Sequence, residues 1–331
     1  MELSAQIGPW LADRAGTTGP LHVELIAAGR SNLTFEVTDA AGRRFALRRP
    51  PEGLTVATAH DVVREARIMR ALADTDVPVP PIVGIEEGAS IIGAPFFVMT
   101  FVEGSILRGR KQSAQVDLEV RHRASRSLVG SLVAIHGVDL QATGLADLAP
   151  GEGYLDRQMD RWYGSYRRVR ADPVDDVEDV LVWLRANRPA TPHATLVHGD
   201  YRLDNAIIDG SGAIRAILDW EIATVGDPVA DLALTVAYWA GEGDEAVGPA
   251  ALPGFLDRHG VVSLYAELSG RDLSDLGWHL VLAYWKLACI SAQIEARYAG
   301  GGGGGDRSRL EGLSEQAARF AARSREMIEL I

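Results

Sequence analysis

The first hundred residues carry the hydrophobic pattern of a β-rich unit. Apolar residues alternate with polar ones or form short apolar runs, as they do in strands, and turn residues separate the segments. The segments that fit this description are residues 21–29, 33–40 and 43–50. Residues 91–104 have the pattern of a strand pair that ends in a turn, and residues 76–84 are expected to be extended because their prolines exclude helix.

Helical spacing begins within this unit and dominates after it. Residues 1–18 have the pattern of a short amphipathic helix, and residues 57–72 repeat apolar side chains at helical spacing, at Val62, Val63, Ala66, Met69 and Leu72. Further helices are predicted at 116–140, 157–169, 176–187, 227–241, 273–300 and 309–331. The glycines of residues 301–305 predict a flexible linker or loop. A small β-rich part followed by a larger helical part favours a two-lobed enzyme with a cleft between its lobes.

Composition and charge narrow the class of protein. Hydrophobic residues make up 47% of the 331-residue chain and charged residues 24%, which is ordinary for a globular protein. We expect neither a membrane partner nor a signal peptide, because no stretch approaches the roughly 20 apolar residues of a membrane span and the N-terminus lacks a basic-then-apolar pattern. The net charge of −12 argues against a nucleic-acid partner. Cys289 is the only cysteine, so no internal disulfide can form, which fits the cytoplasm.

Candidate chemistry is concentrated in residues 195–220, the one β-like interruption of the helical part. The stretch LVHGDYRLDN, residues 196–205, leads from a short strand into a loop that begins at Asp200 and ends at Asn205. A hairpin with a glycine-containing turn follows. If the turn centres on Ser211, Asn205 lies opposite Ile217, and Asp219 lies within two residues of that position across the ladder.

Three oxygen-bearing side chains at one end of a hairpin suit a hard cation. Magnesium prefers oxygen ligands, commonly one or two carboxylates together with phosphate oxygens. Asn205 and Asp219 can hold the metal, which leaves Asp200 free to accept a proton from a hydroxyl group. This division of roles is the template of phosphoryl transfer in kinases.

The motifs HGDYRLDN, ILDWE and GDPVADLA resemble those of the aminoglycoside phosphotransferase family, which also includes choline, homoserine and fructosamine kinases. The segments RSNLTFEV, RRFALRRPP and RQMDRW are most similar to the branch related to kinase-like domains fused to acyl-CoA dehydrogenases. The resemblance spans roughly residues 20–300. It implies an α+β, protein-kinase-like fold of two lobes that uses ATP and Mg²⁺ to phosphorylate a small molecule. We expect a nucleotide-binding N-lobe at residues 1–103 and a C-lobe with the catalytic loop, metal site and acceptor pocket at residues 104–331.

The resemblance also assigns roles in the C-lobe. Asp200 aligns with the catalytic base, and Asn205 and Asp219 align with the magnesium ligands. His198 is expected to hold the loop rather than to transfer protons. Asp227 has the sequence context of a helix N-cap, with proline at the first helical position, and Asp231 that of a loop-anchoring acceptor.

In the N-lobe the resemblance points to a nucleotide site. Backbone groups of the loop at Gly29, Ser31 and Asn32 would cradle phosphates. Arg48 stands where the family places its phosphate-contacting lysine, with Glu65 of the following helix as its ion-pair partner. The backbone from Thr100 to Val102 corresponds to the hinge that contacts adenine.

Several readings stay open at this point. The leading function is transfer of the γ-phosphate of ATP to a hydroxyl group of a small molecule, either aminoglycoside-like or a metabolic acceptor such as a hydroxyacyl-CoA. The arginine at position 48 is the one argument for a non-catalytic nucleotide-binding pseudokinase. A metal-dependent hydrolase would need further ligands that the sequence does not offer at suitable spacing. The resemblance does not separate ATP from GTP, and it leaves a monomer or a homodimer open.

Overall fold

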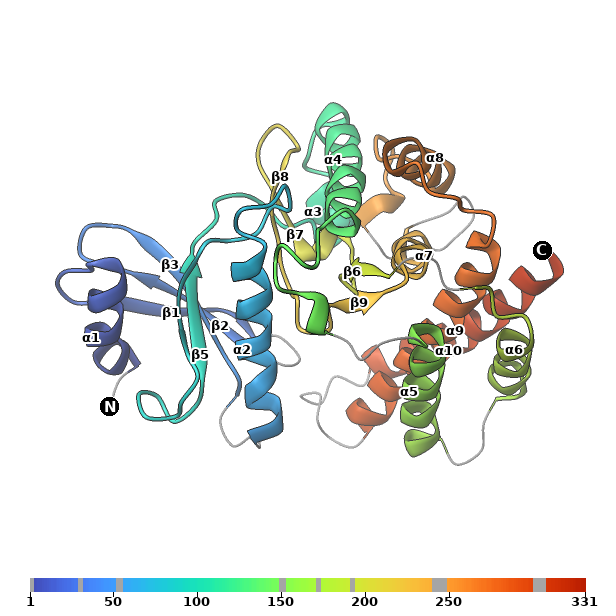
Figure 1. Ribbon diagram of the computed structural model, residues 1–331, viewed down its shortest axis with the longest axis horizontal. Coiled ribbons are helices and arrows are strands. Elements are labelled where there is room, and N and C mark those ends of the chain that lie inside the picture. Colours follow the sequence, from blue (N-terminus) through green and yellow to red (C-terminus); the bar gives the residue numbers. More distant parts are fainter. Residues whose placement is uncertain are drawn as a thin grey trace.

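The computed structural model describes residues 3–28, 32–51, 56–148, 153–170, 174–190, 194–239, 249–299 and 308–331. These residues form a five-stranded antiparallel sheet in the N-terminal part and a mainly helical C-terminal part (Figure 1). The predicted mixed α and β class is therefore confirmed. The glycine run at residues 301–305 lies outside the described residues.

The N-terminal sheet has the strand order β1-β2-β3-β5-β4, with antiparallel neighbours throughout. Its strands are β1 His22–Ala28, β2 Leu33–Thr38, β3 Arg44–Arg49, β4 Ile82–Glu86 and β5 Phe96–Thr100. The expected strand pair within residues 91–104 is wrong, because only β5 forms there and residues 90–94 make a turn. The prolines before β4 keep the chain extended up to the strand, as expected.

Successive side chains of β3 and β5 point to opposite faces of the sheet, so each face packs against a different helix. Phe45 and Leu47 of β3 pack against α1 (Leu3–Ala15), together with Phe96 and Val98 of β5. The intervening residues face the opposite way, toward α2 (Val56–Ala71), and Figure 1 shows α1 and α2 on opposite sides of the sheet. Since successive side chains of a strand point to opposite faces, Arg48 lies on the α2 face.

The C-terminal part consists mainly of helices, and all six helices predicted for it are present. They are α4 Leu118–His136, α5 Tyr154–Val169, α6 Asp175–Ala186, α7 Pro228–Tyr238, α9 Leu276–Ala299 and α10 Ser308–Glu329. Two further helices, α3 Arg110–Ser113 and α8 Arg258–Ser269, were not predicted. The helices α5, α6, α9 and α10 gather around one apolar cluster at the end of the molecule away from the N-terminal sheet (Figure 1).

Short strands lie between the sheet and these helices. They form two antiparallel pairs, β6 (Thr195–Val197) with β9 (Thr224–Gly226) and β7 (Ala206–Ile208) with β8 (Ile214–Ile217). One continuous cluster of buried side chains joins α2 and the sheet to α4, the short strands, α7 and α8. The segment from β6 to β9 is therefore packed directly beside the α2 face of the sheet.

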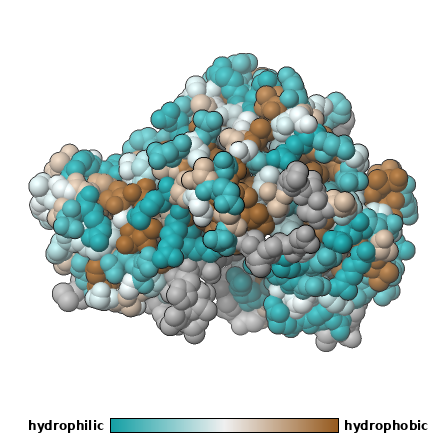
Figure 2. Space-filling model, in the orientation of Figure 1, coloured by the Kyte–Doolittle hydropathy of each residue, from teal (hydrophilic) through white to brown (hydrophobic). Residues whose placement is uncertain are grey.

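Within the described residues, no helix is long and apolar enough to cross a bilayer. On the face seen in Figure 2, hydrophilic residues interrupt the hydrophobic ones, and no broad hydrophobic area is visible among the described residues there.

Candidate active site

The β7–β8 hairpin brings Asn205 and Asp219 to the same end of a ladder. Ala206 pairs with Ile217, and the Leu218 N–H donates to the Asn205 carbonyl at 2.8 Å. Leu218 therefore faces Asn205, and Asp219 is the next residue along the chain. The convergence expected from the sequence is present in the structure.

The expected register, with Asn205 opposite about Ile217 and Asp219 within two residues of it, holds to within one residue at the open end of this hairpin. Ile208 pairs with Ile214, as a turn centred on Ser211 requires, but a bulge follows between Ile207 and Ile208. The extra residue on β8 shifts the pairing, so that Ile217 faces Ala206 rather than Asn205. The shift carries Asp219 one position closer to Asn205.

Asp200 lies in the loop between β6 and the hairpin, held by the amide of Asn205. The Asn205 Nδ2 donates to the Asp200 carbonyl at 2.8 Å and to its Oδ2 at 3.2 Å. The guanidinium of Arg202 lies 3.5 Å from the same Oδ2 and 3.1 Å from Asp204. The Asp200 side chain is 27% exposed, so it stays accessible while its loop is fixed.

The amide contact also decides which atoms are left for a metal. Asn205 uses its Nδ2, which leaves Oδ1 as an acceptor, and Asp219 Oδ2 has no hydrogen bond among the described residues. An amide oxygen and one carboxylate, completed by phosphate oxygens, fit Mg²⁺. The described residues contain no group of three His, Cys, Asp or Glu side chains that could hold a metal by themselves.

Arg48 connects the sheet, α2 and the hairpin. Its Nε lies 3.0 Å from Oε2 of Glu65, and its Nη2 donates to Oδ1 of Asp219 at 2.8 Å. Glu221 lies further away, with Oε2 at 3.9 Å from Nη2. The ion pair between Arg48 and Glu65 that the sequence suggested is thus present, and the same arginine also reaches the candidate metal ligand.

Burial sets the electrostatics of this ion pair. Glu65 is 1% exposed, and burial raises its pKa to about 7, although the charge of Arg48 acts to lower it. The nearby carboxylates of Asp219 and Glu221 raise it further. Glu65 is therefore expected to change its protonation near neutral pH, and the charge of Arg48 favours its ionised form.

A second arginine of α2 holds the segment that follows Asp219. Arg64 donates to the carbonyl oxygens of Glu221, at 3.1 Å, and Ala223. Asp219 itself has φ of 67°, which is uncommon for a residue other than glycine and is best tolerated by Asp and Asn. Docking against α2 therefore helps to hold a backbone conformation that points the Asp219 carboxylate toward Arg48.

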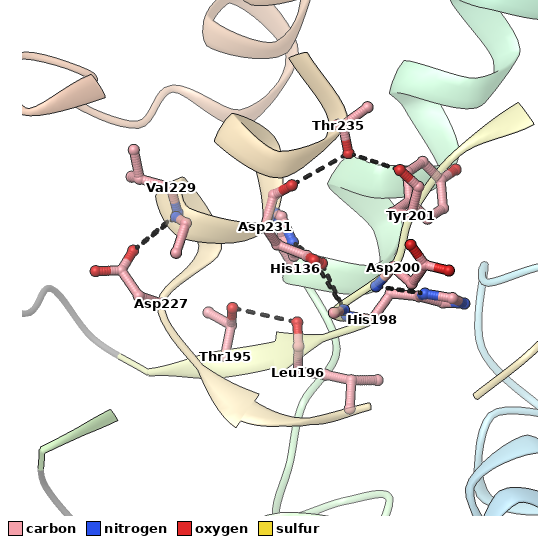
Figure 3. A network of polar contacts seen from close by, with 12 residues as sticks. His136, Thr195, Leu196, His198, Asp200, Tyr201, Asp227, Val229, Asp231 and Thr235 are labelled. Atoms are coloured by element: carbon pink, nitrogen blue, oxygen red, sulfur yellow. Dashed lines mark hydrogen bonds and ion pairs between the residues drawn. The ribbon is translucent and has the colours of Figure 1, made fainter. Parts of the chain in front are cut away.

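Asp231 of α7 anchors the backbone just before Asp200 (Figure 3). Its Oδ2 accepts from the His198 N–H at 2.7 Å, and its Oδ1 accepts from the Gly199 N–H at 2.8 Å. The His136 Nε2 lies 3.2 Å from Oδ2, and the His136 Nδ1 lies 2.6 Å from the Tyr265 hydroxyl. Burial raises the pKa of Asp231, but the contacts with His136 and the backbone N–H groups outweigh it and hold the pKa below its usual value. Asp231 has the anchoring position expected of it.

Asp227 repeats this arrangement one helical turn earlier. Its Oδ1 accepts from the Val229 and Ala230 N–H groups at 2.8 and 3.4 Å, which makes it the N-cap of α7. Its Oδ2 lies 3.1 Å from the Nε2 of His279, a residue of α9. Both carboxylates of GDPVADLA thus tie α7 to histidines of other helices.

Both ring nitrogens of His198 also contact the backbone of this site. Its Nε2 donates to the Leu218 carbonyl at 2.9 Å, and its Nδ1 accepts from the Asp200 N–H at 3.3 Å. The ring is fully buried against Trp220 and Tyr201. Since both ring nitrogens contact backbone groups, His198 links the two halves of the site and is not available for proton transfer.

The N-terminal residues expected to contact a nucleotide are only partly described. Gly29 and Ser31 lie outside the described residues. Asn32 is 5% exposed, and its Nδ2 has no hydrogen-bond partner among the described residues. An unpaired buried amide is costly, so this N–H group is a candidate donor to a ligand.

The hinge segment leaves one amide available. The Thr100 N–H donates to the Pro81 carbonyl at 2.9 Å, and the Phe101 N–H donates to the Arg44 carbonyl at 3.1 Å. The Val102 N–H has no such backbone partner among the described residues. Of the amides of residues 100–102, that of Val102 is therefore the one without a backbone acceptor among the described residues.

Two cationic residues near Asp200 were missed by the sequence reasoning. Arg202 lies within the HGDYRLDN motif itself. Lys286 of α9 donates to the Gly199 carbonyl at 3.1 Å, with its Nζ 5.2 Å from the centre of the Trp162 ring. A single charge within the apolar run LVLAYWKLACI is the signal that could have identified Lys286.

The polar residues of α5 divide into two groups by what they contact. Tyr154 is buried beside Lys286, where both line a small cavity of about 20 Å³. Asp160 and Tyr163 instead contact α6, through Arg185 at 2.7 Å and Glu178 at 2.7 Å. Only part of α5 therefore faces the catalytic loop.

Comparison with known proteins agrees with this geometry. Residues 22–269 match the model of the aminoglycoside phosphotransferase (APH) group, described as the phosphotransferase enzyme family. The match covers most of the chain, and the chain belongs to this family.

Curated relatives carry the name of a different enzyme. Mouse acyl-CoA dehydrogenase family member 10 is 35% identical over 285 residues, which are 84% of this chain and 24% of that protein. The chain spans 24% to 39% of the length of the first such relatives, so the resemblance concerns only a part of each.

Solved structures support the fold over the whole chain. A Ralstonia eutropha JMP134 protein assigned to the aminoglycoside phosphotransferases has a TM-score of 0.80 at 29% identity, covering 96% of this chain and 98% of that one. The GDP complex of aminoglycoside 2′-phosphotransferase-IIIa has a TM-score of 0.66 at 16% identity, covering 97% and 99%, and at this identity it supports the fold alone. The predicted kinase-like fold is confirmed.

Proposed function

We propose that this chain transfers the γ-phosphate of ATP, with Mg²⁺, to a hydroxyl group of a small molecule. Its family supports a small-molecule phosphotransferase in general. The observation that carries the finer proposal is the meeting of Asp200, Asn205 and Asp219 at one end of the hairpin, with Arg48 joining Asp219 to Glu65.

Each residue has a role that follows from its position. Asp200, partly exposed and fixed by Asn205, orients the acceptor hydroxyl and takes its proton. Asn205 and Asp219 hold Mg²⁺ through the oxygens that their other contacts leave free. The metal, when bound, neutralises charge that develops on the transferred phosphoryl group.

The nucleotide contacts are proposed for the N-terminal part. Arg48 faces the phosphates, positioned by Glu65, and the loop of Gly29, Ser31 and Asn32 supplies amide donors. The hinge from Thr100 to Val102 contacts the base. We take residues 1–103 as the nucleotide-binding lobe and residues 104–331 as the lobe that binds metal and acceptor.

The acceptor is proposed at the level of class. The name of the fold neighbours favours an aminoglycoside-like acceptor, and the name of the curated relatives favours a hydroxyacyl-CoA. The positive charge of Arg202 beside Asp200 suits an anionic acceptor better than a polycationic aminoglycoside. We therefore rank the hydroxyacyl thioester first, in a cytoplasmic monomer or homodimer.

Calorimetric titration with ATP, with and without Mg²⁺, is the first test, repeated with GTP because one fold neighbour was solved with GDP. We expect binding that requires Mg²⁺ in the wild type and is weakened in Asp219→Ala. Acceptor-dependent release of ADP, lost in Asp200→Asn, would then establish the transfer reaction. Binding without turnover for any acceptor would favour the pseudokinase alternative, and no nucleotide binding by the folded protein would refute the proposal.

A further inference from the structure

The basic residues of this chain are almost all arginines. Of the 33 lysines and arginines, only Lys111 and Lys286 are lysines. Arginine even stands at position 48, where the resemblance led us to expect a lysine. Lys286 is therefore one of only two side chains with an amino group in a chain whose other basic residues are arginines.

The surroundings of Lys286 make it an expensive residue to keep for packing alone. It lies in the middle of α9, where the residues from Val281 to Cys289 are all buried, and it is itself 9% exposed. Burying an ammonium group costs free energy unless other groups compensate it, so an apolar side chain would be cheaper here. This cost indicates a role of Lys286 other than packing.

Those contacts converge on the catalytic loop. The Nζ donates to the carbonyl of Gly199, the residue that directly precedes Asp200. Trp162 of α5 presents its ring to the same Nζ at 5.2 Å, within the range of a cation–π contact. Asp231, whose negative charge acts to raise the pKa of Lys286, holds the N–H of the same Gly199. The N–H and the carbonyl of Gly199 are thus each held by a charged side chain, from Asp231 and Lys286 of neighbouring helices.

The ammonium group retains capacity for further partners. It has three N–H donors, and one of them is used on Gly199 among the described residues. A cavity of about 20 Å³ adjoins it, lined also by Tyr154, Gln158 and His279. This volume accommodates a water molecule with several polar partners, but no substrate. Lys286 therefore acts on the reaction through the catalytic loop rather than by contact with the acceptor.

We propose that Lys286 is a positioning residue of the phosphoryl-transfer site, which fixes the Gly199–Asp200 segment and supports catalysis only while its amino group is charged. This inference rests on the proposed function. The charged form stabilises the carboxylate of Asp200 and orients it toward the acceptor hydroxyl, and the neutral amine provides a weaker hydrogen bond and no charge.

The surrounding charges are consistent with a change of protonation in the accessible pH range. Burial lowers the pKa of Lys286 to about 8, while Asp200 and Asp231 act to raise it and Arg161 to lower it. Tyr154 and His279 are the other titratable groups that face it across the cavity. The active, charged form is present below this pH and is lost as the pH rises through it.

The small number of lysines makes a direct measurement possible. Lysine labelled with ¹³C at Cε gives two side-chain signals, and Lys111→Arg assigns them. We expect the Lys286 signal to titrate near pH 8. In Asp200→Asn the Lys286 titration should move to lower pH, because a neighbouring negative charge is removed. A Lys286 signal that stays charged beyond about pH 10, or ignores Asp200→Asn, would overturn the inference.

Kinetics test the same point independently. We expect kcat of the wild type to fall above the pH at which Lys286 titrates, and Lys286→Arg, which cannot titrate in this range, to lose this alkaline decline. Lys286→Met keeps an unbranched side chain that is one atom shorter, removes the amino group, and should lower kcat about ten-fold or more with little change in KM for ATP. Lys111→Met is the matched control and should behave as the wild type.

The outcomes separate this inference from the function on which it rests. A folded Lys286→Met variant with wild-type kcat and pH profile would refute the role of Lys286 while leaving the kinase function intact. If the variants do not fold, the wild-type ¹³C titration and pH profile still decide, because they must share one midpoint. Absence of turnover in the wild type would instead refute the proposed function, and the response of the Lys286 signal to Asp200→Asn would remain a test of the contact.

Discussion

Replacing Asp231 with asparagine tests whether the catalytic loop depends on its buried anchor. Three donors face the two carboxylate oxygens, namely the N–H groups of His198 and Gly199 and the Nε2 of His136. Asparagine has almost the same shape but only one acceptor oxygen. Whichever way its amide turns, an NH₂ group meets at least one of these donors.

The expected loss follows from this geometry. With the amide oxygen toward His198 and His136, the Gly199 N–H is left unsatisfied in a site that is 2% exposed, which costs about 1–3 kcal/mol. The two remaining hydrogen bonds lose the charge of their acceptor, which costs roughly a further 1 kcal/mol. Asp231→Asn should therefore destabilise the fold by about 3 kcal/mol, a sizeable part of the ~5–15 kcal/mol typical of a folded domain.

Urea unfolding followed by circular dichroism measures this loss. For a slope of about 3 kcal/mol per molar, the midpoint should fall by roughly 1 M. Asp139→Asn is the matched control, because Asp139 also accepts two backbone N–H groups, from Gln141 and Ala142, but is exposed. We expect less than about 1 kcal/mol from it, since water replaces the lost acceptor.

Equal and small losses in Asp231→Asn and Asp139→Asn would refute the reasoning, because burial would then not be what makes the Asp231 anchor matter. A loss of stability without a loss of phosphate transfer would also contradict the link between this anchor and the position of Asp200.

Three further predictions follow from the electrostatics of the site. The pKa of Asp231 is lowered in the folded state, so its contribution to stability is present above the unfolded-state pKa and is lost as the pH falls. The unfolding midpoint of Asp231→Asn should therefore fall less on acidification than that of the wild type. For Glu65 the sign is opposite, because its pKa is about 7 in the folded state and 4.5 in the unfolded state, so its contribution to stability is lost as the pH rises through 7. Arg48→Met removes the positive charge that lowers this pKa. The melting temperature of Arg48→Met should therefore fall more between about pH 6 and 9 than that of the wild type. Asp219→Ala should leave binding of ATP without metal unchanged and abolish its enhancement by Mg²⁺ in calorimetry; an unchanged magnesium dependence would contradict the assigned ligand.

Regular periodicity explains which elements could be predicted. The helix at α2 was recognisable because its buried positions repeat at helical spacing, and Val62, Val63, Ala66, Met69 and Leu72 are all buried in the structure. The helix α8 was missed because its sequence adjoins an acidic, glycine-containing stretch that obscured its pattern. The strand β9 is only three residues long, too short for periodicity to mark it.

The candidate site was predictable where its residues are close in sequence. Asp200, Asn205 and Asp219 lie within twenty residues, and a hairpin between them is enough to bring them together. The bulge that sets their final register was not predictable, because a bulge has no distinct hydrophobic pattern and depends on what packs against the hairpin.

By itself, then, the sequence determined the family, the order of the main elements and the local group of Asp200, Asn205 and Asp219, since these depend on short-range pattern and motif. Only the tertiary structure decided that Arg48 joins Glu65 to Asp219, 171 residues away in the chain, and that Lys286 reaches the carbonyl before Asp200. Such contacts arise when distant elements pack into one core, and a buried charge acquires its partners and its pKa from that packing rather than from its neighbours in sequence.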